Sequence, residues 1–121
     1  MMKFVSALVA AVALGFAAAP AQPPPCLHGP SSTPEHRARR DAALQYARQV
    51  TSFETAGKNQ AQRYYAIDDL PGLPLLPEGF KARMSTDGAS YAFSVKDTLD
   101  PCHFALFSDQ DGLIYNSTPI Q

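Results

Sequence analysis

Two cysteines, each followed closely by a histidine, are the residues of this chain with the clearest potential chemistry. Cys26-Leu27-His28 and Cys102-His103 could together supply four ligands to a zinc ion. In a strand, however, Cys102 and His103 would point to opposite faces, and no Cys-x-x-Cys spacing supports such a site. We therefore predict a disulfide between Cys26 and Cys102, as expected for a chain that enters an oxidising compartment.

Four aspartates stand at two predicted turns near the end of the chain: Asp97, Asp100, Asp109 and Asp111. Asp109-Gln110-Asp111-Gly112 has the beginning of a calcium loop, but the bidentate glutamate of an EF-hand is absent. Aspartate and glycine are also ordinary turn residues, and the sequence favours that interpretation. Asp109 and Asp111 are therefore the metal-site candidates that remain, for a weakly bound calcium ion, and no other cofactor is predicted.

Other polar clusters give weaker indications. The basic run at residues 36–40, His-Arg-Ala-Arg-Arg, opposes the dipole of the helix it begins, so a partner could compensate it, although such runs are usually solvated. His103 beside Ser94 or Ser108 could be imagined as a base and a nucleophile. No nucleophile elbow and no third triad member accompany them, so we predict that the chain is not an enzyme.

The first 21 residues have the pattern of an export signal. Lys3 is followed by an apolar run from Phe4 to about Ala18, and Ala19-Pro20-Ala21 places cleavage after residue 21. A retained membrane anchor is the alternative, but the run is short for a span of about 20 residues. We therefore expect a periplasmic or extracellular protein with no membrane span after signal cleavage.

Charge and length restrict the mature chain further. Removal of the signal takes Lys3 from the ten basic residues and leaves nine against eleven acidic ones, which gives no argument for binding nucleic acid or an anionic membrane. One domain is expected, with a core that needs no metal. Residues 22–33, rich in proline, are predicted as an extended, ill-ordered tether, pinned at Cys26 if the disulfide forms.

A long helix is predicted after this tether. Ser32-Thr-Pro-Glu35 fits a capping box, with Ser32 as the N-cap and Glu35 three positions later, and Pro34 suits the first turn. The helix should run from Pro34 to about Ala56, break or kink at Gly57, and be followed by a second short helix within residues 58–67. Its apolar stripe comprises Ala43, Tyr46 or Ala47, Val50 and Phe53.

The rest of the chain reads as strands. Residues 68–79 are rich in proline and are predicted as an extended crossover. Strands are expected at residues 80–85, 91–96, 103–108 and 113–115. The third is apolar at nearly every position, as in a strand that is covered on both faces or closed into a core. Short turns between them favour a meander. The predicted fold is α+β: an N-terminal helix packed on a three- to four-stranded antiparallel meander sheet, with Tyr91, Phe93, Val95, Phe104 and Leu106 buried.

Some segments of the chain resemble the globular half of type IV pilins and pseudopilins. They are the Leu-Pro-Gly and Pro-Glu-Gly-Phe motifs within residues 70–80, Tyr-Ala-Phe-Ser-Val at 91–95, and the closing segment at 107–115. Gly15-Phe16 is similar to the prepilin junction, but Pro20 stands where the glutamate should be, and no long apolar helix follows. The resemblance, over about residues 38–121, implies a single pilin-like domain at 34–121 that is exported alone.

These observations lead to one expected function and two alternatives. We expect an exported, non-enzymatic domain that acts through contacts with a partner protein, as an accessory to a secretion or pilus-like system. A small periplasmic module that binds a ligand or calcium is the alternative. A hydrolase-like enzyme is the least favoured, because the residues of such a site are missing.

Overall fold

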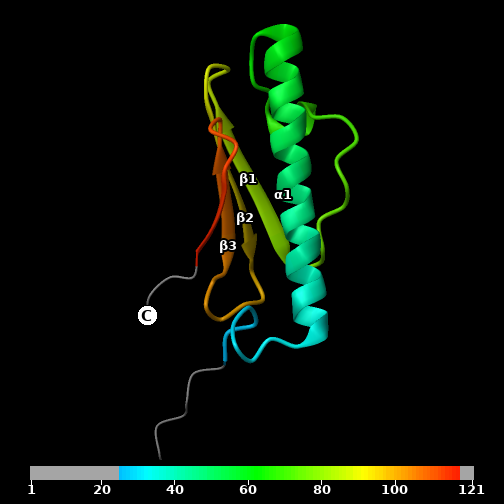
Figure 1. The fold of residues 1–121 in the computed structure, drawn as a ribbon, viewed down its shortest axis with the longest axis vertical. Helices are drawn as coiled ribbons and strands as arrows, with labels where there is room; N and C mark the ends of the chain where they lie inside the picture. The colour runs from blue at the N-terminus through cyan, green and yellow to red at the C-terminus, as the bar shows by residue number, and fades with distance from the viewer. Residues whose placement is uncertain (1–24, 118–121) are drawn as a thin grey trace, which may run out of the picture.

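A computed structural model describes residues 25–117, in which one long helix, α1, lies along one face of a four-stranded antiparallel sheet (Figure 1). This arrangement confirms the predicted α+β fold. The predicted export signal at residues 1–21 lies outside the described residues, as do residues 22–24 of the tether. Within residues 25–117, no helix is both long enough and apolar enough to cross a membrane.

Helix α1 spans Pro34–Ala61 and begins at Pro34 as predicted, but its N-cap lies one residue later than predicted. Thr33 is the N-cap: its side-chain oxygen accepts a hydrogen bond from the His36 backbone N–H at 3.1 Å, and its own N–H donates to His36 Nδ1 at 3.4 Å. The predicted pair of Ser32 and Glu35 is therefore wrong. A histidine completes the same reciprocal arrangement in place of the usual Glu or Gln.

The predicted helix break at Gly57 is also wrong, because α1 continues through it to Ala61 and ends at Gln62, which has a left-handed φ of 61°. A β-carbon at Gly57 would lie only 2.7 Å from ring carbons of Tyr65. The absence of a side chain therefore lets Tyr65 pack directly on the helix. The second short helix predicted within residues 58–67 does not form; among the described residues after α1, the one helical element is a short 3-10 helix, η1, at Ile67–Asp69.

The sheet is the predicted meander, with strands in the order β1-β2-β3-β4. Each strand pairs with the next in antiparallel fashion. The strands are β1 at Phe80–Thr86, β2 at Tyr91–Asp97, β3 at Ala105–Asp109 and β4 at Ile114–Ser117. Because the strands pair in sequence order, β1 and β4 are the two edge strands.

The core lies between α1 and the sheet. Ala43, Ala47 and Val50 of α1 are fully buried. Small residues let the helix approach the strands closely. The predicted inward side chains of the sheet are buried as expected: Tyr91, Phe93, Val95, Phe104 and Leu106.

The opposite face of the sheet has no covering element within the described residues. Phe107, in the middle of β3, is 43% exposed, and Tyr115 of β4 is 54% exposed. Of the two interpretations of the third strand, coverage on both faces is therefore wrong. Its apolar run reflects one buried face and one aromatic residue on an open face.

Candidate functional site

The predicted disulfide joins Cys26 to Cys102, with the two Cα atoms 5.2 Å apart. Both sulfurs are therefore used, and the alternative zinc site is excluded. The two histidines of that site also have different surroundings. The His28 side chain is buried, whereas His103 is exposed and has a backbone φ of 55°.

Asp100 organises the turn that leads from β2 to the disulfide. Its Oδ1 accepts hydrogen bonds from the backbone N–H groups of Cys102 at 3.1 Å and Leu27 at 3.0 Å, and its Oδ2 accepts one from Phe104 at 3.0 Å. The carboxylate is 2% exposed. Asp100 is thus a turn residue, as predicted, but it also holds the N-terminal segment against the turn through Leu27.

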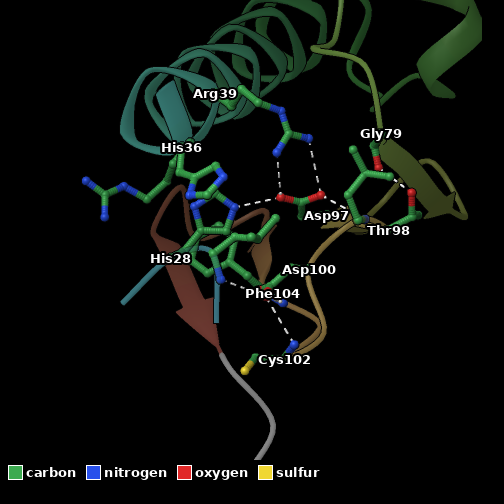
Figure 2. A network of polar contacts seen from close by, with 12 residues as sticks. His28, His36, Arg39, Gly79, Asp97, Thr98, Asp100, Cys102 and Phe104 are labelled. Carbon is green, nitrogen blue, oxygen red and sulfur yellow. Dashed lines mark hydrogen bonds and ion pairs between the residues drawn. The ribbon is translucent and has the colours of Figure 1, made fainter. Parts of the chain in front are cut away.

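Asp97 forms a second buried cluster, drawn in Figure 2. His28 Nε2 lies 2.6 Å from Asp97 Oδ2, and the guanidinium of Arg39 lies 3.2 and 3.3 Å from the two carboxylate oxygens. The backbone N–H of Leu99 donates a further hydrogen bond. The His28 side chain is 1% exposed and that of Asp97 is fully buried. We call these residues, His28, Arg39 and Asp97, the buried lock.

The charge of Asp97 is stabilised within the buried lock. Burial by itself raises the pKa of the Asp97 carboxyl, but hydrogen bonds from His28, Arg39 and the Leu99 N–H, together with the positive charge of Arg39, lower it below its ordinary value. An ionised carboxylate only accepts hydrogen bonds, so the proton of the short contact belongs to His28 Nε2. His28 Nδ1 then has no partner among the described residues.

Aromatic rings enclose the lock. The His28 ring lies 4.6 Å from that of Phe104 between centroids, and the Arg39 guanidinium stacks 5.0 Å from the centre of the Phe80 ring. A histidine paired with an aspartate could serve in acid–base chemistry. Here both side chains are closed off from solvent, and their contacts join the N-terminal segment and α1 to the end of the sheet.

Two expectations change in this region. Residues 26–28 are not an ill-ordered tether, because a disulfide and bonds to two buried aspartates fix them. Arg39 is not simply solvated with the rest of the basic run, since its guanidinium binds Asp97 and the Glu78 carbonyl oxygen. Neither partner is near in sequence, so the composition of either segment could not reveal these contacts.

The predicted calcium candidates lie away from the lock. β3 separates the Asp97–Asp100 turn from the turn that contains Asp109 and Asp111, so the four aspartates do not converge. Asp109 Oδ1 accepts a hydrogen bond from the Asp111 backbone N–H at 2.9 Å, which is ordinary turn chemistry. No group of three or more His, Cys, Asp or Glu residues suited to a metal occurs within residues 25–117.

The open face of the sheet gathers residues that the sequence analysis did not single out as a site. The register places Arg83, Ser94, Phe107 and Tyr115 in one row across all four strands. The exposed Lys81 and Lys96 face each other in the next row. The strand register brings Lys81, Arg83 and Lys96 beside the aromatic pair.

Comparison of the chain with protein-family models, with curated proteins and with solved structures finds no match.

Proposed function

We propose that this chain is an exported, non-enzymatic domain that acts by binding another protein through the open face of its sheet. The observation that carries this proposal is the pairing of exposed aromatic and basic side chains on that face. Phe107 and Tyr115 are direct cross-strand neighbours, and both are substantially exposed. Tyrosine, phenylalanine and arginine are enriched at protein interfaces, whereas isolated domains usually bury such rings.

The lysines add an electrostatic argument. Lys81 and Lys96 lie directly opposite each other on the same face of an antiparallel pair. Like charges in that position are destabilising by up to about 1 kcal/mol. A carboxylate on a partner would relieve this repulsion, so the face is complementary to a surface with both apolar and acidic groups.

The disulfide is consistent with an oxidising, exported compartment. Within such a compartment, we propose that the partner belongs to a secretion or pilus-like system. The support for this narrower step is the resemblance carried by the segments at residues 70–80, 91–95 and 107–115, together with the helix-on-meander architecture that the resemblance implies.

Site-specific photo-crosslinking in the native host tests both steps. A photoreactive residue placed at Phe107 or Tyr115 should give one discrete crosslinked species, whereas the same residue at the exposed Ser52 of α1 should not. Mass spectrometry of the species then identifies the partner. Equal crosslinking from Ser52 would contradict the proposed surface, and a partner with no role in secretion or pili would contradict the narrower step alone.

A further inference from the structure

A groove of about 630 Å³ runs between α1 and the edge strand β4. Its apolar lining includes Leu44 of α1, Leu106 of β3 and Ile114 of β4. Phe104, immediately before β3, completes it. The helix packs over β3 and leaves β4 beyond its edge, so the inner face of β4 is only partly covered. The groove therefore occupies the position where the sheet could be extended by another strand.

Two arginines of α1 line this groove, Arg40 and Arg48, with Leu44 between them. Their spacing of four and eight positions places all three on one side of the helix. Arg48 has no hydrogen-bond or ion-pair partner among the described residues. Arg40 has only Asp41, at 3.8 Å and largely exposed. The groove thus presents two nearly unpaired cations on either side of an apolar centre.

β4 is suited to accept a further strand. It pairs with β3 alone, and within the described residues no backbone hydrogen bond is made along its other edge. Such an edge is a template for strand addition by an extended peptide. The inward side chains of an added strand would lie over the groove, since Ile114 and Asn116 of β4 already line it.

The two geometries agree in length. Eight residues of helix separate Arg40 from Arg48 by about 12 Å along its axis. In an extended strand, residues four apart lie on the same face at about 13 Å. Carboxylates at positions i and i+4 of an added strand would therefore meet the two arginines, and the residue at i+2 would face Leu44.

We propose that this groove binds an extended segment of a partner polypeptide as a fifth strand beside β4, with two acidic residues four positions apart and an apolar residue midway between them. The proposal shares with the proposed function the premise that the chain acts through protein contacts. It concerns a different surface, and its test uses no residue of the open face except as a control.

A labelled peptide containing Glu-Thr-Val-Thr-Glu, flanked by threonines, is the direct probe, with fluorescence anisotropy as the measurement. The matched peptide Gln-Thr-Val-Thr-Gln should bind roughly tenfold more weakly, because two exposed ion pairs are lost. Arg40→Gln with Arg48→Gln should produce the same loss. Arg83→Gln with Lys96→Gln, on the opposite face, should leave binding unchanged. Amide chemical shifts should change along β4 and the facing side of α1.

Exchanging the charges of the groove and the peptide distinguishes a loss of ion pairs from a general loss of folding or binding. Arg40→Glu with Arg48→Glu should reject the glutamate peptide and bind its lysine counterpart, Lys-Thr-Val-Thr-Lys. Equal binding of the glutamate and glutamine peptides, or no binding of the glutamate peptide, would overturn the proposal. Sedimentation showing dimers joined through β4 would overturn it too, because a second copy would then occupy the edge. Crosslinking from Phe107 is independent of all these outcomes.

Discussion

Two fully buried carboxylates, one on β2 and one on α1, lie near opposite ends of β2, and their surroundings differ. Asp97, at the end of the strand, contacts an arginine, a histidine and a backbone N–H. Glu54 of α1 lies near Tyr91, at the start of the strand. Both Glu54 oxygens share one donor, the Tyr65 backbone N–H, at 3.1 and 3.2 Å.

Their pKa values move in opposite directions. Burial raises the pKa of the Glu54 carboxyl, and the single Tyr65 N–H offsets only part of that rise. At Asp97, burial acts in the same direction but the bonds from His28 and Arg39 outweigh it, so the pKa falls. Burial therefore does not by itself decide whether a carboxylate is stabilised as an ion. The number and charge of its donors do.

The comparison also separates two structural roles. The Asp97 end joins three distant segments, namely the N-terminal segment, α1 and the β2–β3 turn, and adds a disulfide. The Glu54 end joins only α1 to the loop that follows it. We therefore expect changes at the Asp97 end to affect global stability, and changes at Glu54 to act more weakly and with a clear pH dependence.

Loss of the disulfide should have the largest effect. The bond closes a loop with a sequence separation of 76, for which the chain-entropy model gives about 4 kcal/mol of stability. Cys26→Ser with Cys102→Ser should lower the free energy of unfolding, measured in guanidinium chloride, by about that amount. Reduced wild-type protein is the matched control. A loss below about 1 kcal/mol would contradict the prediction, because it would mean that residues 26–28 are released from the folded domain once the bond is absent.

Asp97→Asn should have the second largest effect, a loss of about 3 kcal/mol in the free energy of unfolding. The charge of Arg39 then remains partly buried without its partner. Thermal and denaturant unfolding both report the change. Asp109→Asn, at a half-exposed turn position, is the control and should cost under about 0.5 kcal/mol. Similar losses for the two variants would contradict the assignment of Asp97 as a buried ion-pair partner.

The wild-type protein should lose the contribution of Asp97 in acid. A lowered folded-state pKa means that this stability is present above the ordinary value of 3.8 and disappears as pH falls through that value toward the folded pKa. The difference in unfolding free energy between wild type and Asp97→Asn, measured from pH 7 down to pH 2, should therefore shrink below about pH 4. A difference that stays constant across this range would contradict the lowered pKa.

Glu54→Gln should have the opposite sign. With a raised folded-state pKa, ionisation of Glu54 costs stability as pH rises above its ordinary value of 4.5, and the cost is complete above the folded pKa. The glutamine variant should therefore be more stable than wild type at pH 7 and equal to it near pH 4. Melting temperatures across this pH range measure the difference, and a variant less stable at pH 7 would contradict the prediction.

The exposed acidic turn should give the smallest effect. Asp109 and Asp111 offer two carboxylates, of which one already accepts a backbone hydrogen bond, so calcium should bind with millimolar affinity at best. Calorimetry should show no micromolar binding, and added calcium should not shift the melting temperature. A micromolar affinity that disappears in Asp109→Asn would instead establish the calcium site.

The sequence predicted those parts of the fold that depend on local periodicity. Alternation in residues 91–95 placed Tyr91, Phe93 and Val95 on the buried face, and short turns predicted the meander. Gly57 was misjudged because glycine weakens a helix on average, whereas here its bare Cα is needed for contact with Tyr65. That requirement is set by tertiary packing, which no local pattern records.

The candidate sites were predicted less completely than the fold. The disulfide followed from composition and compartment alone. The buried lock did not, because His28 and Arg39 are 69 and 58 positions from Asp97, and each looks like a surface residue in its own segment. The row from Arg83 to Tyr115 required the pairing of four strands, and the groove required the position of α1 over β3.

The wide separation of the two cysteines also determines when the disulfide can form during synthesis or export. A polypeptide leaves the ribosome, or an export pore, with its N-terminus first, so Cys26 emerges well before Cys102. The Cys26 thiol has no intramolecular partner until nearly the whole domain has emerged. With two cysteines there is one intramolecular pairing, so no shuffling among alternatives is needed. The hazard during the wait is capture by a second nascent copy, and the yield of monomer therefore depends on the timing of oxidation.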